Sequence, residues 1–231
     1  GDSTRYTLGY MAQMGGWALL QDALYSSESP FELLRLAYTS LMSTWAILNA
    51  GDEESNYGYW FPGKENDGAT SGGFEAAPYG KTWLGQNHQR GAWIYGCETD
   101  LGHCGYLRGA SVVLAADPDF GETLYGGLME EKDGERHIIP TDGVARRFHI
   151  IASQDDRIHV ELYSAHMKDI RLAKDGSIRI SLRDVSPAYA HAVVSTHSGE
   201  DKISVNGMKG TEVKYVLHDD SELCIRIEKA E

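Results

Sequence analysis

The second half of the sequence alternates apolar and polar residues over short segments, and this pattern constrains the fold more than any other feature. Residues 158–162 read Ile-His-Val-Glu-Leu, and residues 177–182 read Ser-Ile-Arg-Ile-Ser-Leu. A period of two places alternate side chains on opposite faces of a strand, so these segments predict half-buried strands. Asp-Gly or Asn-Gly pairs stand between several of them, at residues 133–134, 175–176 and 206–207. Such dipeptides favour the tight turns of β-hairpins.

About ten short segments of this kind, spaced by roughly 8–12 residues, predict an antiparallel β-sandwich over residues 118–231. The boundary with the first half is expected at Asp117-Pro118, because proline cannot continue a helix. The expected strands are residues 123–129, 136–139, 145–151, 157–163, 169–172, 177–182, 190–196, 202–205, 212–217 and 222–227.

The first half, residues 1–117, reads as a helical segment with long loops rich in aromatic residues and glycine. Residues 10–25 carry apolar side chains at spacings of three and four, which predicts a helix, although Gly15 and Gly16 weaken the pattern. A further helix is expected over residues 100–115, where glycines spaced by three and four would permit close packing.

A strong helix-start signal lies at Ser29-Pro30-Phe31-Glu32. Ser29 suits the N-cap, Pro30 the first helical position, and Glu32 the capping box, so a helix is predicted from residue 31 to about residue 49. This helix is apolar on most sides, which is typical of a helix inside a larger helical array. The sequence therefore predicts an α+β fold: a partial (α/α) toroid-like helical segment followed by the sandwich. The missing helical partners would come from an upstream part of the natural polypeptide or from a second copy of the chain.

The charge balance excludes several classes of partner. The chain of 231 residues has a formal net charge of −13. Nucleic acids and anionic membrane surfaces both require a basic face, so neither is an expected partner. The sequence contains no run of about 18 apolar residues, so no transmembrane helix is predicted.

No cofactor or metal is expected. The sequence contains no phosphate-binding loop, no dinucleotide fingerprint and no His-Glu-x-x-His motif. Cys97, His103 and Cys104 match no standard zinc spacing, although a calcium ion on Asp and Glu oxygens remains an alternative. Three cysteines, with Cys224 as the third, give no disulfide framework and are read as buried free thiols.

Residues 57–68 read Tyr-Gly-Tyr-Trp-Phe-Pro-Gly-Lys-Glu-Asn-Asp-Gly and form the first candidate site. Aromatic rings stack on the C–H faces of sugars, while carboxylates, amides and lysine bind hydroxyl groups. The alternative is that the rings anchor the loop to the core and the acids are solvated. Residues 86–93 place several hydrogen-bonding side chains beside a tryptophan, and each of these is also an ordinary surface residue type. The predicted substrate-binding residues are Tyr59, Trp60, Trp83, His88, Arg90 and Trp93.

The candidate catalytic residues are four carboxylates. Glycoside hydrolysis requires two acids, one to protonate the leaving oxygen and one to activate water or attack the sugar. Glu65 or Asp67, paired with Glu98 or Asp100, is the predicted set. A purely structural alternative is that Thr99 or Asp100 serves as the N-cap of the helix expected at residues 100–115.

The order of apolar helices, residues 57–68, the Gly-Cys-Glu-Thr-Asp-Leu-Gly run at residues 96–102, and then a sandwich resembles the C-terminal part of large bacterial proteins that are similar to six-hairpin (α/α)6 toroid glycosidases. The resemblance implies a carbohydrate-active enzyme, a glycoside hydrolase, acting on an oligo- or polysaccharide. It also implies a secreted or periplasmic bacterial setting. Independent catalysis by this chain would require the upstream part of the toroid.

Two other functions remain open at this stage. One is a carbohydrate-binding or structural module that uses the same aromatic residues without catalysis. The other is a polysaccharide lyase that uses Tyr, His and Arg side chains on uronates. Five histidines in the sandwich half (His149, His159, His166, His191 and His197) are expected to be satisfied or surface residues.

Overall fold

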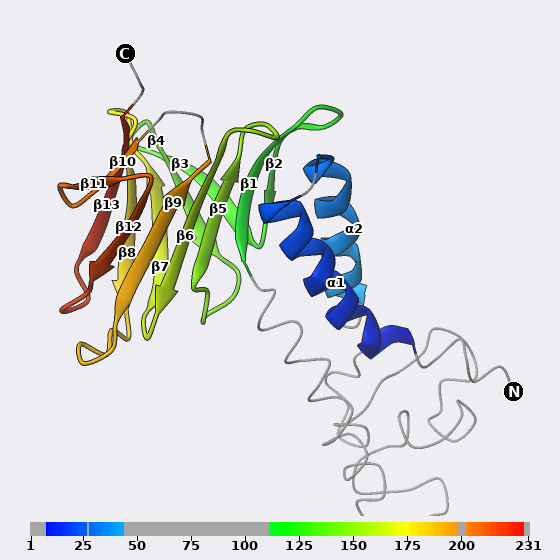
Figure 1. The fold of residues 1–231 in the computed structure, drawn as a ribbon, viewed down its shortest axis with the longest axis horizontal. Coiled ribbons are helices and arrows are strands. Elements are labelled where there is room, and N and C mark those ends of the chain that lie inside the picture. The colour runs from blue at the N-terminus through cyan, green and yellow to red at the C-terminus, as the bar shows by residue number, and fades with distance from the viewer. Residues whose placement is uncertain (1–7, 27, 44–110, 198–201, 229–231) are drawn as a thin grey trace, which may run out of the picture. The chain divides into compact units, whose positions relative to one another are not determined.

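The computed structural model describes residues 8–26, 28–43, 111–197 and 202–228. These residues form two helices and thirteen strands, which divide into two compact units (Figure 1). One unit holds α1 and nearly all of α2, and the other holds every described strand. An α+β fold, with helices first and sheets after them, is therefore confirmed. The described residues show no toroid-like array of helices, so that part of the prediction remains untested.

The two helices begin close to where the sequence predicts. Helix α1 spans Leu8–Tyr25 and α2 spans Pro30–Ser43. Pro30 is the first residue of α2, where its missing N–H costs no hydrogen bond, and Glu32 places a negative charge in the first turn. The end of the predicted second helix, residues 44–49, lies outside the described residues.

The two helices pack closely where α1 carries a glycine. A Cβ at Gly16 would lie 2.9 Å from the carbonyl oxygen of Ala37 and 2.9 Å from the backbone nitrogen of Leu41. Glycine is therefore needed there for the backbones to approach, which offsets its low helix propensity. The buried apolar residues of this unit are Leu20, Ala23, Leu24, Leu34, Ala37 and Leu41.

The strands form two sheets that pack face to face as a β-sandwich (Figure 1). The six-stranded sheet has the order β12-β9-β6-β5-β1-β2, and the seven-stranded sheet has the order β11-β10-β13-β8-β7-β4-β3. The strands of the six-stranded sheet are β1 (Val112–Asp117), β2 (Gly121–Tyr125), β5 (Arg147–Ile151), β6 (Arg157–Tyr163), β9 (His191–Thr196) and β12 (Glu212–Val216). Those of the seven-stranded sheet are β3 (Gly127–Lys132), β4 (Glu135–Pro140), β7 (His166–Leu172), β8 (Ile178–Arg183), β10 (Lys202–Val205), β11 (Met208–Gly210) and β13 (Glu222–Glu228).

The inner faces of the two sheets share one apolar core. Phe148 and Val160 come from the six-stranded sheet, and Ile138, Ile180 and Ile225 come from the seven-stranded sheet; all five are fully buried. Along β8, Ile178, Ile180 and Leu182 are buried at alternate positions, as the period of two predicts. The predicted strands 157–163 and 202–205 are confirmed with the same bounds, and the expected sandwich is confirmed with them.

The predicted helix over residues 100–115 is wrong at its described end. Val112, Val113, Leu114 and Ala115 form the start of β1 and are all buried. A strand buried on both faces reads as a continuous apolar run, which periodicity cannot distinguish from a buried helix. β1 thus joins the sandwich, and residues 100–110 lie outside the described residues.

Residues 123–129 were expected as a single strand, but they belong to two strands in different sheets. β2 ends at Tyr125 and β3 begins at Gly127. Between them Gly126 has φ +72°, and a Cβ there would collide with the carbonyl oxygen of Ser111. Only glycine allows the chain to cross between the sheets at this point.

The pairing of the strands also departs from the expectation of a fully antiparallel sandwich. Among the described strands, β1 and β5 run parallel, with Val113 beside His149, while the other neighbours are antiparallel. All three predicted turns are confirmed, and Asp175 and Gly176 (Gly176 φ 79°) join β7 to β8. Asp133 and Gly134 (φ 55° and 72°) join β3 to β4, and Asn206 and Gly207 (φ 45° and 92°) join β10 to β11.

Ile138 and Ile139 provide a matched test of the face assignment on β4. Ile138 is 0% exposed in the core, whereas its neighbour Ile139 is 40% exposed on the opposite face. We expect Ile138→Ala to lower the free energy of unfolding by about 2–5 kcal/mol, because it leaves a cavity, and Ile139→Ala to lower it by less than about 1 kcal/mol. Urea unfolding of both variants measures the difference. Equal losses, or a larger loss for Ile139→Ala, would contradict the register of β4.

Candidate functional site

The ten site residues predicted from the sequence all lie outside the described residues. The structure therefore neither brings them together nor separates them, and they stay predictions. They are Glu65, Asp67, Glu98 and Asp100 as catalytic residues, and Tyr59, Trp60, Trp83, His88, Arg90 and Trp93 as substrate-binding residues. The described residues offer two other features with chemical potential, an inter-sheet cleft and the outer face of the six-stranded sheet.

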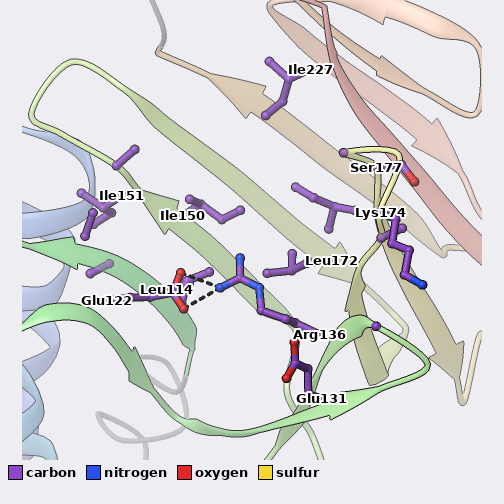
Figure 2. Close-up of a pocket in the computed structure, with 17 residues that line it drawn as sticks. Leu114, Glu122, Glu131, Arg136, Ile150, Ile151, Leu172, Lys174, Ser177 and Ile227 are labelled. Atoms are coloured by element: carbon purple, nitrogen blue, oxygen red, sulfur yellow. Dashed lines mark hydrogen bonds and ion pairs between the residues drawn. The ribbon is translucent and has the colours of Figure 1, made fainter.

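The inter-sheet cleft lies at one end of the sandwich, where the two sheets leave about 560 Å³ between them. One wall is formed by the end of β1, the start of β2 and the end of β5. The other wall comes from β4, from the loop between β7 and β8, and from β13 (Figure 2). The volume is within the usual range for small-molecule sites, roughly 300–1,000 Å³. The apolar lining residues are Leu114, Ala115, Ala116, Ile150, Ile151, Ala152, Leu172, Ala173, Ile178 and Ile227.

An ion pair spans the cleft from one sheet to the other. Arg136 on β4 donates from Nη1 to both carboxylate oxygens of Glu122 on β2, at 2.5 and 2.6 Å (Figure 2). The Arg136 side chain is 41% exposed, so the pair is partly solvated and is expected to contribute little to stability. Neither Nε nor Nη2 of Arg136 donates a hydrogen bond to a described residue. One edge of the guanidinium is therefore left open to a ligand.

A tight turn supports the opposite wall. Asp175 accepts hydrogen bonds from the backbone N–H of Ser177 at 3.0 Å and from its hydroxyl at 2.5 Å. These bonds, followed by the charges of Arg179 and Arg226, lower the pKa of Asp175 to about 2. The carboxylate thus stays ionised through the neutral and mildly acid range. It orders the loop that carries Gly176 and Ser177 along the cleft.

The outer face of the six-stranded sheet carries a small aromatic platform. The rings of Tyr163 and His191 stack with centroids 4.6 Å apart and an interplanar angle of 4°. The Tyr163 hydroxyl donates to Glu161 at 2.8 Å, and this bond is the largest cause of the raised pKa of Tyr163. Arg147 lies across from Glu161, with Nε 3.9 Å from its carboxylate. A ring flanked by a carboxylate and a guanidinium is a combination suited to sugar hydroxyls.

Two histidines are buried on that same sheet face, on neighbouring strands. His149 on β5 and His159 on β6 are opposite each other in register, and their Nδ1 atoms lie 2.9 Å apart. One Nδ1 must donate a hydrogen and the other must accept it. The two rings therefore cannot both carry a positive charge while this bond exists. Burial first, and then the neighbouring charge of His159, holds the pKa of His149 well below its usual value. Burial, His197 and Arg157 lower the pKa of His159 to about 4, against an opposing effect of Glu161.

The described residues show no metal site and no membrane span. They hold no group of three or more His, Cys, Asp and Glu side chains that could bind a metal ion. No described helix is long and apolar enough to cross a membrane. Cys224 is a free thiol, half-buried on β13. Comparison of the chain with protein-family models, with curated proteins and with solved structures gave no match.

Sequence reasoning missed the cleft, although one signal for it exists. Arg136 and Ile138 share a face of β4 by alternation, so Arg136 occupies an inward-facing position. A charged residue at such a position marks a place where the core is open or where the charge has a partner. His149 and His159, which were expected to be satisfied or surface residues, are buried and bond to each other through their Nδ1 atoms. Their mutual bond, however, depends on strand register, which the sequence does not show.

The buried histidine pair makes the sandwich sensitive to acid. In the unfolded chain histidine titrates near pH 6.5, whereas His159 in the folded chain has a pKa of about 4. The unfolded state therefore binds more protons, and the stabilisation present above pH 6.5 is lost as the pH falls toward 4. For His159 we expect a loss on the order of 1 kcal/mol at pH 5.5.

Urea unfolding at pH 7.5 and pH 5.5 measures this loss. We expect His159→Gln to reduce the pH dependence, because glutamine cannot titrate, and His218→Gln on the exposed surface to leave it as in the unaltered chain. If all three proteins lose the same free energy of unfolding, the histidine pair is not the acid-sensitive element.

Proposed function

We propose that this chain is part of a carbohydrate-active protein, a glycoside hydrolase in which residues 57–104 supply the rings and carboxylates. The observation that carries the proposal is the combination of residue types in this segment. Residues 57–68 join three aromatic rings in a row to Glu65 and Asp67, and residues 96–102 add Glu98 and Asp100. Rings provide stacking surfaces for sugars, and two carboxylates are the minimum for acid–base cleavage of a glycosidic bond.

The roles of the carboxylates follow from the chemistry of the reaction. One acid, in its protonated form, gives its proton to the leaving oxygen. The other, ionised, activates a water molecule or attacks the anomeric carbon. A separation of roughly 5–5.5 Å would give retention of configuration, and roughly 6.5–9.5 Å would give inversion. The upstream part of the polypeptide or a second copy of the chain is proposed to complete the helical scaffold around them.

A second candidate function, glycan binding without hydrolysis, is supported by the platform on the sandwich. Tyr163 is 44% exposed and stacked on His191, with Glu161 within hydrogen-bonding distance. An exposed, ordered ring next to a carboxylate suits a sugar ring that is bound but not cleaved. This candidate requires only residues of the sandwich unit.

Hydrolysis of a panel of oligo- and polysaccharides by the full-length natural polypeptide tests the first candidate. We expect release of reducing ends, and a loss of roughly 100-fold or more in Glu98→Gln or Asp67→Asn, because removal of a catalytic acid or base typically costs this much. Glu130→Gln, on the exposed surface of β3, is the control and should retain the rate. Product absorbing as an unsaturated uronate would instead identify a lyase. Unchanged glycan binding in Trp60→Ala and Trp83→Ala would remove the basis for a sugar site in this segment.

Glycan affinity of two tyrosine variants tests the binding candidate. Tyr163→Ala removes the stacked ring, and we expect it to weaken binding by about 5- to 100-fold, corresponding to about 1–3 kcal/mol for a lost aromatic contact. Tyr189→Ala, which removes a ring that is 75% exposed and lies in the loop before β9, is the matched control. Equal affinities of the two variants and the unaltered chain, with hydrolysis absent, would exclude the platform as a glycan site.

A further inference from the structure

We propose that the inter-sheet cleft binds a free aliphatic carboxylate, with the hydrocarbon chain between the sheets and the carboxylate on Arg136. This inference goes beyond the proposed function. It rests on residues of the sandwich alone. Its ligand is apolar along most of its length, whereas a sugar carries hydroxyl groups over most of its surface. Failure of glycan binding and failure of carboxylate binding are therefore separate results.

The lining of the cleft suits a saturated chain. Leu114 and Ile150 form one wall, and Leu172, Ile178 and Ile227 form the other. Among the described residues no aromatic side chain lines the cleft, so it offers no ring on which a sugar could stack, and most of its lining side chains are apolar. Packed sheets lie about 10 Å apart, so the space between them is a slot rather than a sphere. An extended hydrocarbon fits such a slot and buries its methylene groups against both walls.

The open edge of Arg136 supplies the recognition of the head group. Arg136 uses Nη1 alone to hold Glu122, while Nε and Nη2 make no hydrogen bond to a described residue. Nε–H and Nη2–H are parallel donors on one edge of a planar group, which is the geometry that binds a carboxylate through both oxygens. In Figure 2 the guanidinium extends from β4 into the cleft beside Ile150 and Leu172. Head and tail sites are thus contiguous.

The charges around the mouth predict how the affinity can be tuned. The cleft is lined by two negatively charged residues, Glu122 and Glu131, and two positively charged residues, Arg136 and Lys174. The net charge of these four side chains is therefore zero. A bound carboxylate adds one negative charge next to Glu122. Removing the Glu122 charge should therefore strengthen binding, although it removes the ion pair that the structure shows. A purely structural role for Arg136 and Glu122 predicts no such gain.

Titration of the full chain with hexanoate, octanoate and decanoate, below their micelle concentrations, tests the assignment of the tail. Each methylene that leaves water for the cleft should tighten binding by up to about fourfold. Decanol and decylammonium test the head group, because they carry the same chain with a neutral or a positive end. We expect decanoate to bind most tightly and decylammonium least. Chemical-shift changes of the Ile150 and Ile178 methyl groups locate the ligand.

Substitutions of the head-group residues provide the second part of the test. Arg136→Gln should weaken decanoate binding by about 10- to 100-fold, the range expected for hydrogen bonds between charged groups. Arg136→Lys keeps the charge but loses the paired donors, so we expect an intermediate affinity. Glu122→Gln should bind severalfold more tightly. Arg146→Gln, which removes an exposed guanidinium just before β5 and outside the cleft lining, should bind as the unaltered chain does.

Three results would overturn the proposal. They are an affinity that does not change with chain length, decylammonium binding as tightly as decanoate, and equal affinities for Arg136→Gln and Arg146→Gln. The thermal midpoint of each variant shows whether it is folded. If Arg136→Gln does not fold, the gain expected for Glu122→Gln and the chain-length series decide the matter by themselves.

Discussion

The sandwich depends on one apolar layer that both sheets share. Each strand of the two sheets must send every second side chain into the same interior, because neither sheet can bury its apolar face alone. Phe148 on one sheet and Ile180 on the other meet this requirement at their fully buried positions. The order of the strands, the hairpin turns and the crossing at Gly126 all serve to bring those inner faces together. Polar chemistry is consequently confined to the outer faces and to the ends where the layer stops.

The inter-sheet cleft lies where the shared apolar layer ends, although the strands of both sheets continue beyond it. Strand β4 shows the transition within three residues, since Ile138 is in the core and Arg136, on the same face, is half-exposed at the cleft. An arginine on an inward face is tolerated there because its aliphatic stem packs along the wall and its charged end meets Glu122 across the gap. The ion pair therefore marks the position where the core ends, and it contributes little to the stability of the fold. Its partly solvated position is also what leaves one side of the guanidinium accessible.

Alternation along the chain made most of the sandwich predictable, and the exceptions have identifiable causes. Strand β6 was predicted with its observed bounds because it is apolar on alternate positions and ends in polar turns. Strand β1 was not, because burial on both faces removes the alternation that distinguishes a strand from a buried helix. The division of residues 123–129 between two sheets, and the parallel pairing of β1 with β5, depend on how distant segments meet. The cleft depends on the same long-range arrangement, so only the inward position of Arg136 hinted at it.

The two kinds of recognition proposed for this chain place contrary demands on a protein surface. A sugar presents hydroxyl groups in every direction and is held by rings and short polar side chains, such as those at residues 57–68. An alkyl carboxylate presents one charged end and is otherwise held by the exclusion of water. The sandwich separates these chemistries: Tyr163 and Glu161 lie on an outer face, whereas Arg136 and Ile150 line the gap between the sheets. Because no side chain serves both sites, a substitution that abolishes one ligand's binding should leave the other's affinity unchanged, and a shared loss would indicate damage to the common apolar layer.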